Sequence, residues 1–186
     1  MRKLLIGLTG RAGSGKTTAA EHIAGEFCFN EYALAQPIKE AVATLFGQDI
    51  GFAQGEAKEA VIPWLGKSSR QLQQLLGTEW GRKLVHPDIW LLLAEREWCR
   101  TLTGPAKGLV IGDIRFDNEA KWIKRNGGYI INVFREGVQP VVTHESENGI
   151  DPYLIDIWVD NSGSLEGFAQ ELEHYVRQFQ LYGMTP

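Results

Sequence analysis

The sequence is poor in cysteine and contains no long apolar run. Its two cysteines, Cys28 and Cys99, have no spacing typical of a metal site or a redox motif, so we expect two reduced, buried thiols. The first apolar run reaches glycines at Gly7 and Gly10 and is too short for a signal peptide. No apolar stretch approaches the roughly 20 residues that span a bilayer. We therefore expect a cytoplasmic protein, in the host cytoplasm if the gene is viral, with no membrane partner.

The sequence also lacks an excess of basic charge. Its formal net charge of −4 argues against binding to a nucleic-acid backbone. The contents of 44% hydrophobic and 23% charged residues are ordinary for a globular protein. A chain of 186 residues is long enough to form one compact domain with a sizeable core.

Strands and helices alternate along the chain. Continuous apolar runs are typical of buried strands in a parallel sheet, and apolar residues at helical spacing separate them. This alternation predicts an α/β fold in three layers, with a mostly parallel five-stranded sheet flanked by helices. We expect strands over 4–8, 31–35, 108–112, 129–134 and 157–159, helices over 16–27, 38–46, 69–84, 88–102, 118–125 and 165–179, and irregular segments over 47–67 and 135–156.

The segment between the first strand and the first helix matches the pattern G-x-x-x-x-G-K-[ST]. Its glycines let successive backbone N–H groups point inward, and the helix that follows adds the positive end of its dipole. The Lys16 ammonium can reach the β- and γ-phosphates, and the Thr17 hydroxyl can bind Mg²⁺. The pattern predicts a nucleoside triphosphate site for ATP and Mg²⁺, formed by Ala12, Gly13, Ser14, Gly15, Lys16, Thr17 and Thr18.

Further charged residues stand near the ends of predicted elements. Asp113 ends the strand "GLVIGD", which is where the carboxylate that binds the metal stands in this class of fold. No strand-ending D-x-x-G occurs together with a guanine-reading N-K-x-D, which argues against a GTPase. A small kinase needs cations on several elements to bring two phosphates together. The candidates are Lys39, Arg70, Arg82, Arg115 and Arg135.

The order of five blocks resembles the deoxynucleoside monophosphate kinases of bacteriophages. The blocks are the phosphate loop, "YALAQPIKEAV", "SRQLQQLLGTEWGR", "GDIRFDNEA", and "THESENGI" followed by "DIWVDNSGSLE". The resemblance covers nearly the whole chain and is weak over 47–67. It implies a P-loop NTPase fold over 1–186 as a single kinase domain, with a substrate-binding helical region at about 36–103 and a lid at about 135–156.

The resemblance implies that the γ-phosphoryl group of ATP is transferred to a deoxynucleoside monophosphate, which supplies diphosphates for phage DNA synthesis. The acceptor oxygen is already anionic at neutral pH, so catalysis needs charge neutralisation and alignment more than a general base. Lys16, Arg115 and Arg135 are the candidate catalytic residues, and Thr17 and Asp113 the candidate Mg²⁺ ligands.

The resemblance also implies a set of nucleotide contacts. Lys39, Arg70, Arg82 and Arg11 would hold the acceptor phosphate, since a guanidinium can bind phosphate through two nitrogens. For Trp90, packing in the core competes with contact to a base or sugar. The remaining candidates are Gln74, Thr78, Glu119, His144, Ser146 and Glu147 for the acceptor, and Asn161 and Gly163 for the adenine.

Two alternatives stay open. Kinases of the dephospho-coenzyme A or phosphomevalonate type share parts of the pattern but would explain "LLGTEWGR" less well. A regulatory module that hydrolyses ATP slowly would release phosphate equally with and without a deoxynucleotide. The sequence does not reveal the base preference or the selectivity for deoxyribose. The six tryptophans would suit the homodimer that we expect and equally a large core.

Overall fold

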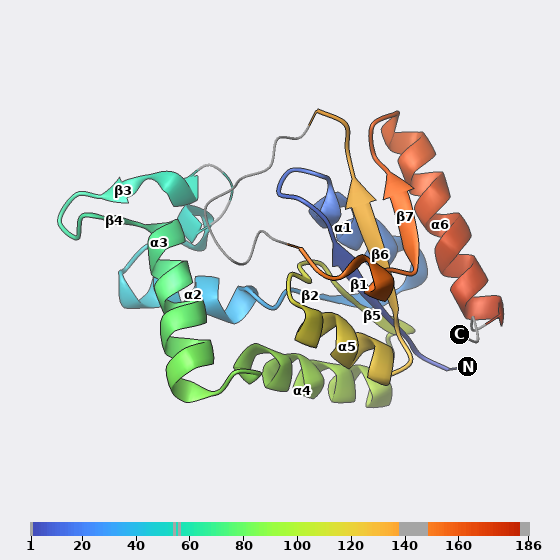
Figure 1. Ribbon diagram of the computed structural model, residues 1–186, viewed down its shortest axis with the longest axis horizontal. Coiled ribbons are helices and arrows are strands. Elements are labelled where there is room, and N and C mark those ends of the chain that lie inside the picture. Colours follow the sequence, from blue (N-terminus) through green and yellow to red (C-terminus); the bar gives the residue numbers. More distant parts are fainter. Residues whose placement is uncertain (1, 54, 56, 138–148, 183–186) are drawn as a thin grey trace. The chain divides into compact units, whose positions relative to one another are not determined.

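The computed structural model describes residues 2–53, 55, 57–137 and 149–182 (Figure 1). The chain divides into two compact units. The first comprises Met1–Ala33 and Glu95–Pro186, and the second comprises Leu34–Ala94. The helical region predicted to bind substrate, 36–103, overlaps the second unit.

The main sheet lies in the first unit and is parallel throughout. Its five strands follow the order β2-β5-β1-β6-β7, and every neighbouring pair runs parallel. β1 is buried at every position, as expected of a continuous apolar run at the centre of a parallel sheet. The predicted five-stranded sheet is confirmed. The strands are β1 (Leu4–Thr9), β2 (Phe29–Tyr32), β5 (Gly108–Ile111), β6 (Tyr129–Phe134) and β7 (Ile157–Asp160).

The second strand lies earlier in the chain than predicted. The sequence suggested 31–35, whereas β2 begins at Phe29. Cys28 takes a left-handed conformation with φ of 56°, which ends the preceding helix and turns the chain directly into the strand. Phe29 then pairs with Gly108 of β5, so the strand is complete by Tyr32.

Helices cover both faces of this sheet (Figure 1). α1 (Lys16–Phe27) and α6 (Leu165–Tyr182) pack on one face around Leu8 and Ile131. α5 (Asp117–Arg125) covers the other face, where a Cβ on Gly7 would lie only 2.5 Å from Ile123 Cδ1. The three predicted layers are therefore present. Among the helices in the described ranges, none is both long and apolar enough to cross a membrane.

Both cysteines are exposed, so the prediction of buried thiols is wrong. Cys28 sits at the turn that ends α1. Cys99 lies on α4 (Ile89–Thr103), a helix that contributes residues to both units. The buried positions of this helix include Ala94, Trp98 and Thr101, which leave Cys99 on the outer side.

The second unit contains helices and one short hairpin. The segment predicted to be irregular, 47–67, holds two short 3₁₀ turns and the antiparallel pair β3–β4. Ser68 caps the next helix, with its hydroxyl accepting from Gln71 N and the Gln71 side chain accepting from Ser68 N. The elements are α2 (Gln36–Leu45), η1 (Ile50–Ala53), η2 (Ala57–Glu59), β3 (Val61–Ile62), β4 (Lys67–Ser68), α3 (Ser69–Gln74) and η3 (Leu75–Val85).

The helix predicted over 69–84 widens into a π-helix at η3. Its hydrogen bonds span five residues, as in the bond from His86 N to Gly81 O at 2.9 Å. Two glycines allow close packing here: a Cβ on Gly77 would lie 2.9 Å from Ile38 Cδ1, and one on Gly81 would lie 2.5 Å from Trp90 Cζ2. These contacts give the "LLGTEWGR" block a packing role within the second unit.

We predict that Leu172→Ala lowers the free energy of unfolding by about 2–5 kcal/mol, because it leaves a cavity beside α1. Leu172 is fully buried in the core between α6 and the sheet. Leu165→Ala, on the same helix but 65% exposed, serves as the control and should change the free energy of unfolding by less than about 0.5 kcal/mol. Urea unfolding followed by circular dichroism measures both, and equal effects would contradict this packing.

Candidate active site

The loop between β1 and α1 passes unusually close to its neighbours. A Cβ on Gly10 would lie 2.1 Å from Val133 O, and one on Gly15 would lie 2.2 Å from Asn161 Nδ2. Both glycines also have positive φ angles, of 134° and 104°. A side chain at either position would therefore clash and be strained. The glycines of the predicted motif are required by the close approach of this loop to β6 and to the segment after β7.

A cation and a buried hydroxyl lie inside this loop. Lys16 Nζ donates to Gly10 O at 2.7 Å and to Arg11 O at 2.8 Å. Ser14 Oγ is buried without a hydrogen-bond partner in the described part of the chain. Lys16 is also the first residue of α1, whose N-terminus has no side-chain cap. An ammonium group, a buried donor and uncapped helical N–H groups together fit a bound phosphate chain.

Asn161 follows the edge strand β7 and contacts the phosphate loop. Its side-chain amide donates to Ser14 O at 2.9 Å, and its backbone N–H donates to Phe134 O at 2.8 Å. The amide nitrogen therefore supports the loop directly. Contact of Asn161 with an adenine ring stays a prediction, as does contact by Gly163, which has open space around its Cα.

The residues predicted to bind Mg²⁺ lie in the first unit. Thr17 is exposed on the first turn of α1, and Asp113 follows β5, the parallel neighbour of β1. Within the ranges that the structure describes, no group of three or more His, Cys, Asp or Glu residues could hold a metal. The Mg²⁺ ligand roles of Thr17 and Asp113 remain predictions.

α1 is fastened to α6 by an ion-pair network behind the loop. His22 Nε2 lies 3.2 Å from Glu173 Oε1, and Arg177 Nη2 lies 3.0 Å from Glu173 Oε2 and 3.3 Å from Glu26 Oε1. The hydrogen bond from Arg177, aided by the one from His22, lowers the pKa of the Glu173 carboxyl below its ordinary value. This network helps to hold the helix that carries the phosphate loop.

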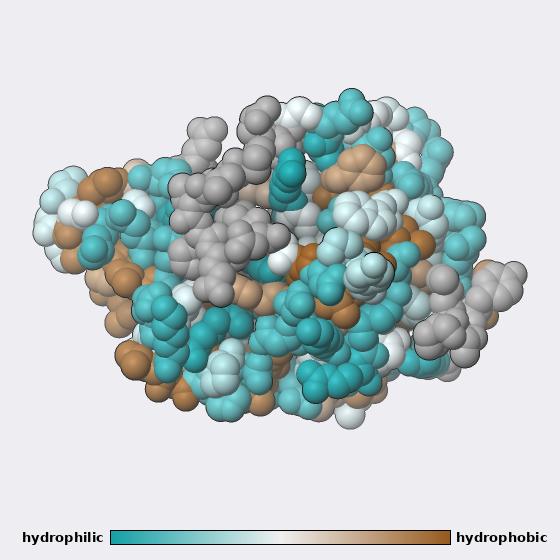
Figure 2. Space-filling view, viewed as in Figure 1, coloured by the Kyte–Doolittle hydropathy of each residue, from teal (hydrophilic) through white to brown (hydrophobic). Residues whose placement is uncertain are grey.

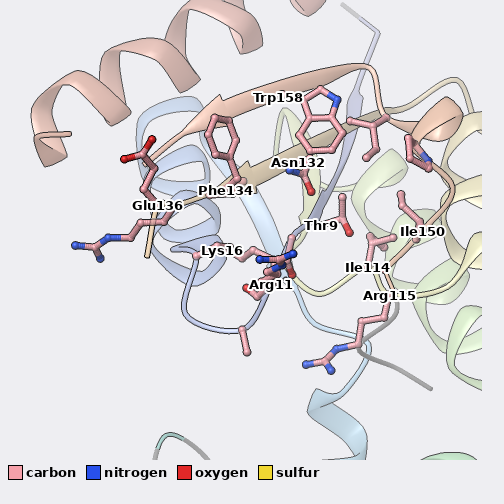
Figure 3. A pocket seen from close by; sticks show the side chains of 18 residues that line it. Thr9, Arg11, Lys16, Ile114, Arg115, Asn132, Phe134, Glu136, Ile150 and Trp158 are labelled. Carbon is pink, nitrogen blue, oxygen red and sulfur yellow. Dashed lines mark hydrogen bonds between the residues drawn. The ribbon is translucent and has the colours of Figure 1, made fainter. Parts of the chain in front are cut away.

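A cavity of about 640 Å³ opens beside the loop (Figure 3). Four cations line it: Arg11 and Lys16 from the loop, Arg115 from the segment after β5, and Arg135 from the end of β6. The carboxylate among its lining residues is Glu136. Cations that converge on one concave space attract an anionic ligand. The fold thus brings predicted site residues from three distant parts of the sequence to one cavity.

Glu119 has a supporting role that the sequence did not suggest. Its side chain is 2% exposed and accepts hydrogen bonds from Arg115 N at 2.7 Å and Phe116 N at 3.1 Å. The carboxylate thus fixes the backbone just before α5, including the residue that lines the cavity. Contact of Glu119 with a substrate stays a prediction, beside the structural role that its bonds to these backbone groups show.

The remaining acceptor candidates lie in the second unit. Arg70 Nε forms an ion pair with Glu59 Oε1 at 2.6 Å, and Arg82 Nη1 donates to Pro87 O at 3.4 Å. Trp90 is buried and its indole N–H donates to Gly77 O at 2.8 Å. Core packing, the competing interpretation for Trp90, is therefore what the structure shows. Lys39, Gln74 and Thr78 are partly buried, and their substrate contacts stay predictions.

The predicted lid is described only at its two ends. Arg135 is exposed where β6 ends, and the described chain resumes at Gly149. His144, Ser146 and Glu147 lie outside the described residues, so their predicted contacts with substrate stay predictions.

The lining residues that sequence reasoning missed include Thr9, Phe134, Trp158 and, as the fourth, Asn132. Thr9 and Phe134 are the last residues of β1 and β6, and ligands bind at such strand ends in open parallel sheets. The fourth, Asn132, interrupts the apolar run "YIINVF" of β6. A polar amide within a buried strand was the signal that could have identified it.

Comparison with known proteins gives related kinases. The family model described as "Deoxynucleotide monophosphate kinase" matches residues 56–172. A protein of Acanthamoeba polyphaga mimivirus named as a deoxynucleotide monophosphate kinase is 35% identical over 184 residues, which cover 91% of this chain and 94% of that protein. The deoxynucleoside-5′-monophosphate kinase of Escherichia phage T5 is 26% identical in a match that covers 79% of this chain and 85% of that protein.

Solved structures share the fold at low sequence identity. A shikimate kinase from Aquifex aeolicus matches with a TM-score of 0.50 and 16% identity, over 96% of this chain and 99% of that one. A sugar kinase from Janibacter sp. matches with a TM-score of 0.52 and 13% identity, over 95% of each chain. These matches confirm the predicted P-loop fold.

We predict that Asn161→Ala weakens ATP binding by roughly fivefold, because a hydrogen bond that supports the loop contributes about 1 kcal/mol. Asn126→Ala is the matched control, since that amide donates only to Trp122 O of its own helix. Equilibrium titration with ATP measures both affinities. Unchanged ATP affinity in Asn161→Ala would show that the loop holds its shape without this bond.

Proposed function

The chain belongs to the deoxynucleotide monophosphate kinase family, and from this premise we propose that it transfers the γ-phosphoryl group of ATP to the 5′-phosphate of a deoxynucleoside monophosphate. The products are a deoxynucleoside diphosphate and ADP. The observation that carries the proposal is the convergence of Arg11, Lys16, Arg115 and Arg135 on one cavity beside the phosphate loop. Transfer between two phosphate groups requires this concentration of positive charge.

The phosphate loop would hold the donor. Backbone N–H groups at the start of α1 would bind the β- and γ-phosphates. The Lys16 ammonium would bind the same phosphates, which would replace the two backbone carbonyls that it now contacts. Thr17 and Asp113 would hold Mg²⁺, which neutralises charge on the phosphate oxygens when it is bound. Asn161 would keep the loop in place through its bond to Ser14 O.

Arginines would align the acceptor with the donor. The acceptor phosphate is already an anion near neutral pH, so the chain needs to supply no strong general base. Arg11 and Arg115 line the cavity next to the loop and would hold the two phosphates close together. Arg135 would offset the charge that develops on the transferring group.

For the second unit, we propose that Arg70 binds the acceptor phosphate, with Lys39 and Arg82 as further cations. Arg70 is held in place by Glu59 through a contact of 2.6 Å. A phosphate would replace this carboxylate as the anionic partner of the guanidinium, with two nitrogens available to its oxygens. Gln74 and Thr78 remain candidates for contact with the nucleoside.

The homodimer expected from the tryptophans also remains a proposal. Trp90, Trp98 and Trp122 are buried in the cores. Exposed hydrophobic side chains of the second unit include Leu45, Trp64, Trp80 and Leu84. Figure 2 shows patches of brown, hydrophobic surface over this unit. Such side chains would suit an interface between two copies, and sedimentation or size-exclusion chromatography would detect the dimer.

We predict that ADP release from Mg·ATP is stimulated by at least one deoxynucleoside monophosphate. The coupled assay would compare dAMP, dGMP, dCMP and dTMP with the ribonucleotides, dephospho-coenzyme A and mevalonate phosphate.

Arg115→Ala should lower kcat/KM by roughly 100-fold or more, because it removes a positive charge that stabilises the transferring phosphoryl group. Arg125→Ala is the control, since this exposed arginine of α5 bonds to Lys121 O of its own helix. Equal ADP release with and without every acceptor would favour a regulatory ATPase instead.

We further predict that Arg70→Ala raises the KM for the deoxynucleotide by roughly 10- to 100-fold, the worth of a hydrogen bond to a charged group. The affinity for ATP should not change, which an equilibrium titration can check. Arg96→Ala, an exposed arginine of α4, is the matched control. An unaltered KM in Arg70→Ala would remove this residue from the acceptor site.

A further inference from the structure

The cavity holds a buried asparagine on β6 whose side chain pairs with none of the described residues. Asn132 is 8% exposed, and its side-chain amide makes no hydrogen bond to any residue within the described ranges. The backbone of Asn132 is satisfied, because β6 pairs with β1 on one side and β7 on the other. An amide that faces a cavity and has no partner among the described residues is available to hydrogen-bond water or a ligand. Asn132 lines the cavity, where Figure 3 shows its amide beneath Trp158 and beside Thr9.

Asn132 stands in a row across three strands. It pairs in register with Thr9 of β1 and with Trp158 of β7. Side chains two residues apart on a strand share a face, so Thr9 faces the same side as Gly7, which packs against Ile123 of α5. Their neighbours Leu8, Ile131 and Val133 point to the opposite face and pack against α1 and α6. The row therefore forms a floor on the α5 side of the sheet.

The floor of the cavity lies apart from the place expected for the adenine ring of ATP. The adenine candidates, Asn161 and Gly163, lie beyond the end of β7, and Asn161 contacts the loop at Ser14. A donor nucleotide bound along the loop and toward these residues leaves the floor on the α5 side unfilled. A second nucleotide can occupy this space, with its phosphate toward the arginines that line the same cavity.

The walls of the cavity suit a flat ring. Trp158 is 52% exposed, and its ring centroid lies 6.5 Å from that of Phe134, another lining residue. Ile114, Ile150 and Ile155 supply apolar surface. The volume of about 640 Å³ lies in the ordinary range for small-molecule sites. A ligand that is anionic at one end, and flat with a polar edge at the other, matches a nucleoside monophosphate.

We propose that Asn132 hydrogen-bonds the base edge of the acceptor deoxynucleotide while Trp158 stacks on the base, so that Asn132 selects which base is accepted. This inference rests on the proposed kinase function. It places base recognition in the first unit, on residues that the resemblance did not indicate. An asparagine amide both donates and accepts, so it can pair with two neighbouring groups of one base edge.

Asn132→Asp tests the selection directly. A carboxylate accepts from the amino groups of adenine, cytosine and guanine, but it repels the two carbonyl oxygens that flank the single N3–H of thymine. We expect the ratio of kcat/KM for dAMP, dCMP and dGMP over that for dTMP to rise at least tenfold. Asn30→Asp is the matched control, because this asparagine also lies on a strand, is partly buried and donates to Thr101 Oγ1 at 2.9 Å. The order of kcat/KM values for the four deoxynucleotides should be the same in this variant as in the unaltered protein.

Asn132→Leu separates recognition from structure. An amide that bonds only cavity water loses little when an apolar side chain of similar size replaces it, so Tm should not fall, whereas the loss of a structural asparagine would lower Tm. We expect the same variant to lose at least tenfold in kcat/KM for the preferred deoxynucleotide, with ATP affinity unchanged. Trp158→Ala should raise the KM for every deoxynucleotide, and Trp158→Phe should restore most of the loss.

The outcomes distinguish the two levels of the proposal. If the unaltered protein shows no ADP release that depends on a deoxynucleotide, the kinase function itself is overturned and the base site falls with it. If the unaltered protein is active but both Asn132 variants keep its base ranking, only the assignment of Asn132 is overturned. A lower Tm in Asn132→Leu, together with weaker ATP binding, would assign Asn132 a structural role.

Discussion

The close approach of the phosphate loop to two neighbouring strands is the constraint on which the rest of the first unit depends. Val133 O lies where a side chain on Gly10 would be, and the Asn161 amide lies where a side chain on Gly15 would be. The Asn161 amide in turn donates to Ser14 O, so the segment after β7 holds the loop that follows β1. Because the strands are parallel, their carboxyl ends meet at one edge of the sheet, and the loop can be supported from several sides at once.

The same parallel arrangement concentrates positive charge. Arg11, Arg115 and Arg135 follow three different strands, yet all three line one cavity together with Lys16. The buried carboxylate of Glu119 holds the backbone at Arg115 and Phe116, so the position of Arg115 depends on a buried acidic residue. The floor of the same cavity has a different character, with the Asn132 amide among the aromatic rings of Phe134 and Trp158. A site with a cationic end and an aromatic end suits a ligand with both parts, as a mononucleotide has.

In the second unit, two glycines allow close packing against a buried tryptophan. Gly77 and Gly81 allow Ile38 and Trp90 to approach the widened helix η3, and the indole of Trp90 donates to Gly77 O. The resemblance to phage kinases rested partly on this block of sequence. Its glycines have a packing explanation that requires no ligand, whereas Arg70 is partly exposed and held by Glu59 at the surface of the unit.

The sequence by itself determined the five-stranded sheet and the phosphate loop, because continuous apolar runs and a glycine motif of fixed spacing are local signals. The family followed from the resemblance of five ordered blocks. The sequence did not determine where β2 begins, which depends on the left-handed Cys28, nor the burial of Trp90 and Glu119. Only the tertiary structure decided which arginines share a cavity and that Asn132 lies on its floor. The physical reason is that a contact between strand ends depends on sheet order and on which face each side chain takes. A one-residue shift in register would have moved Asn132 to the face covered by α1 and α6.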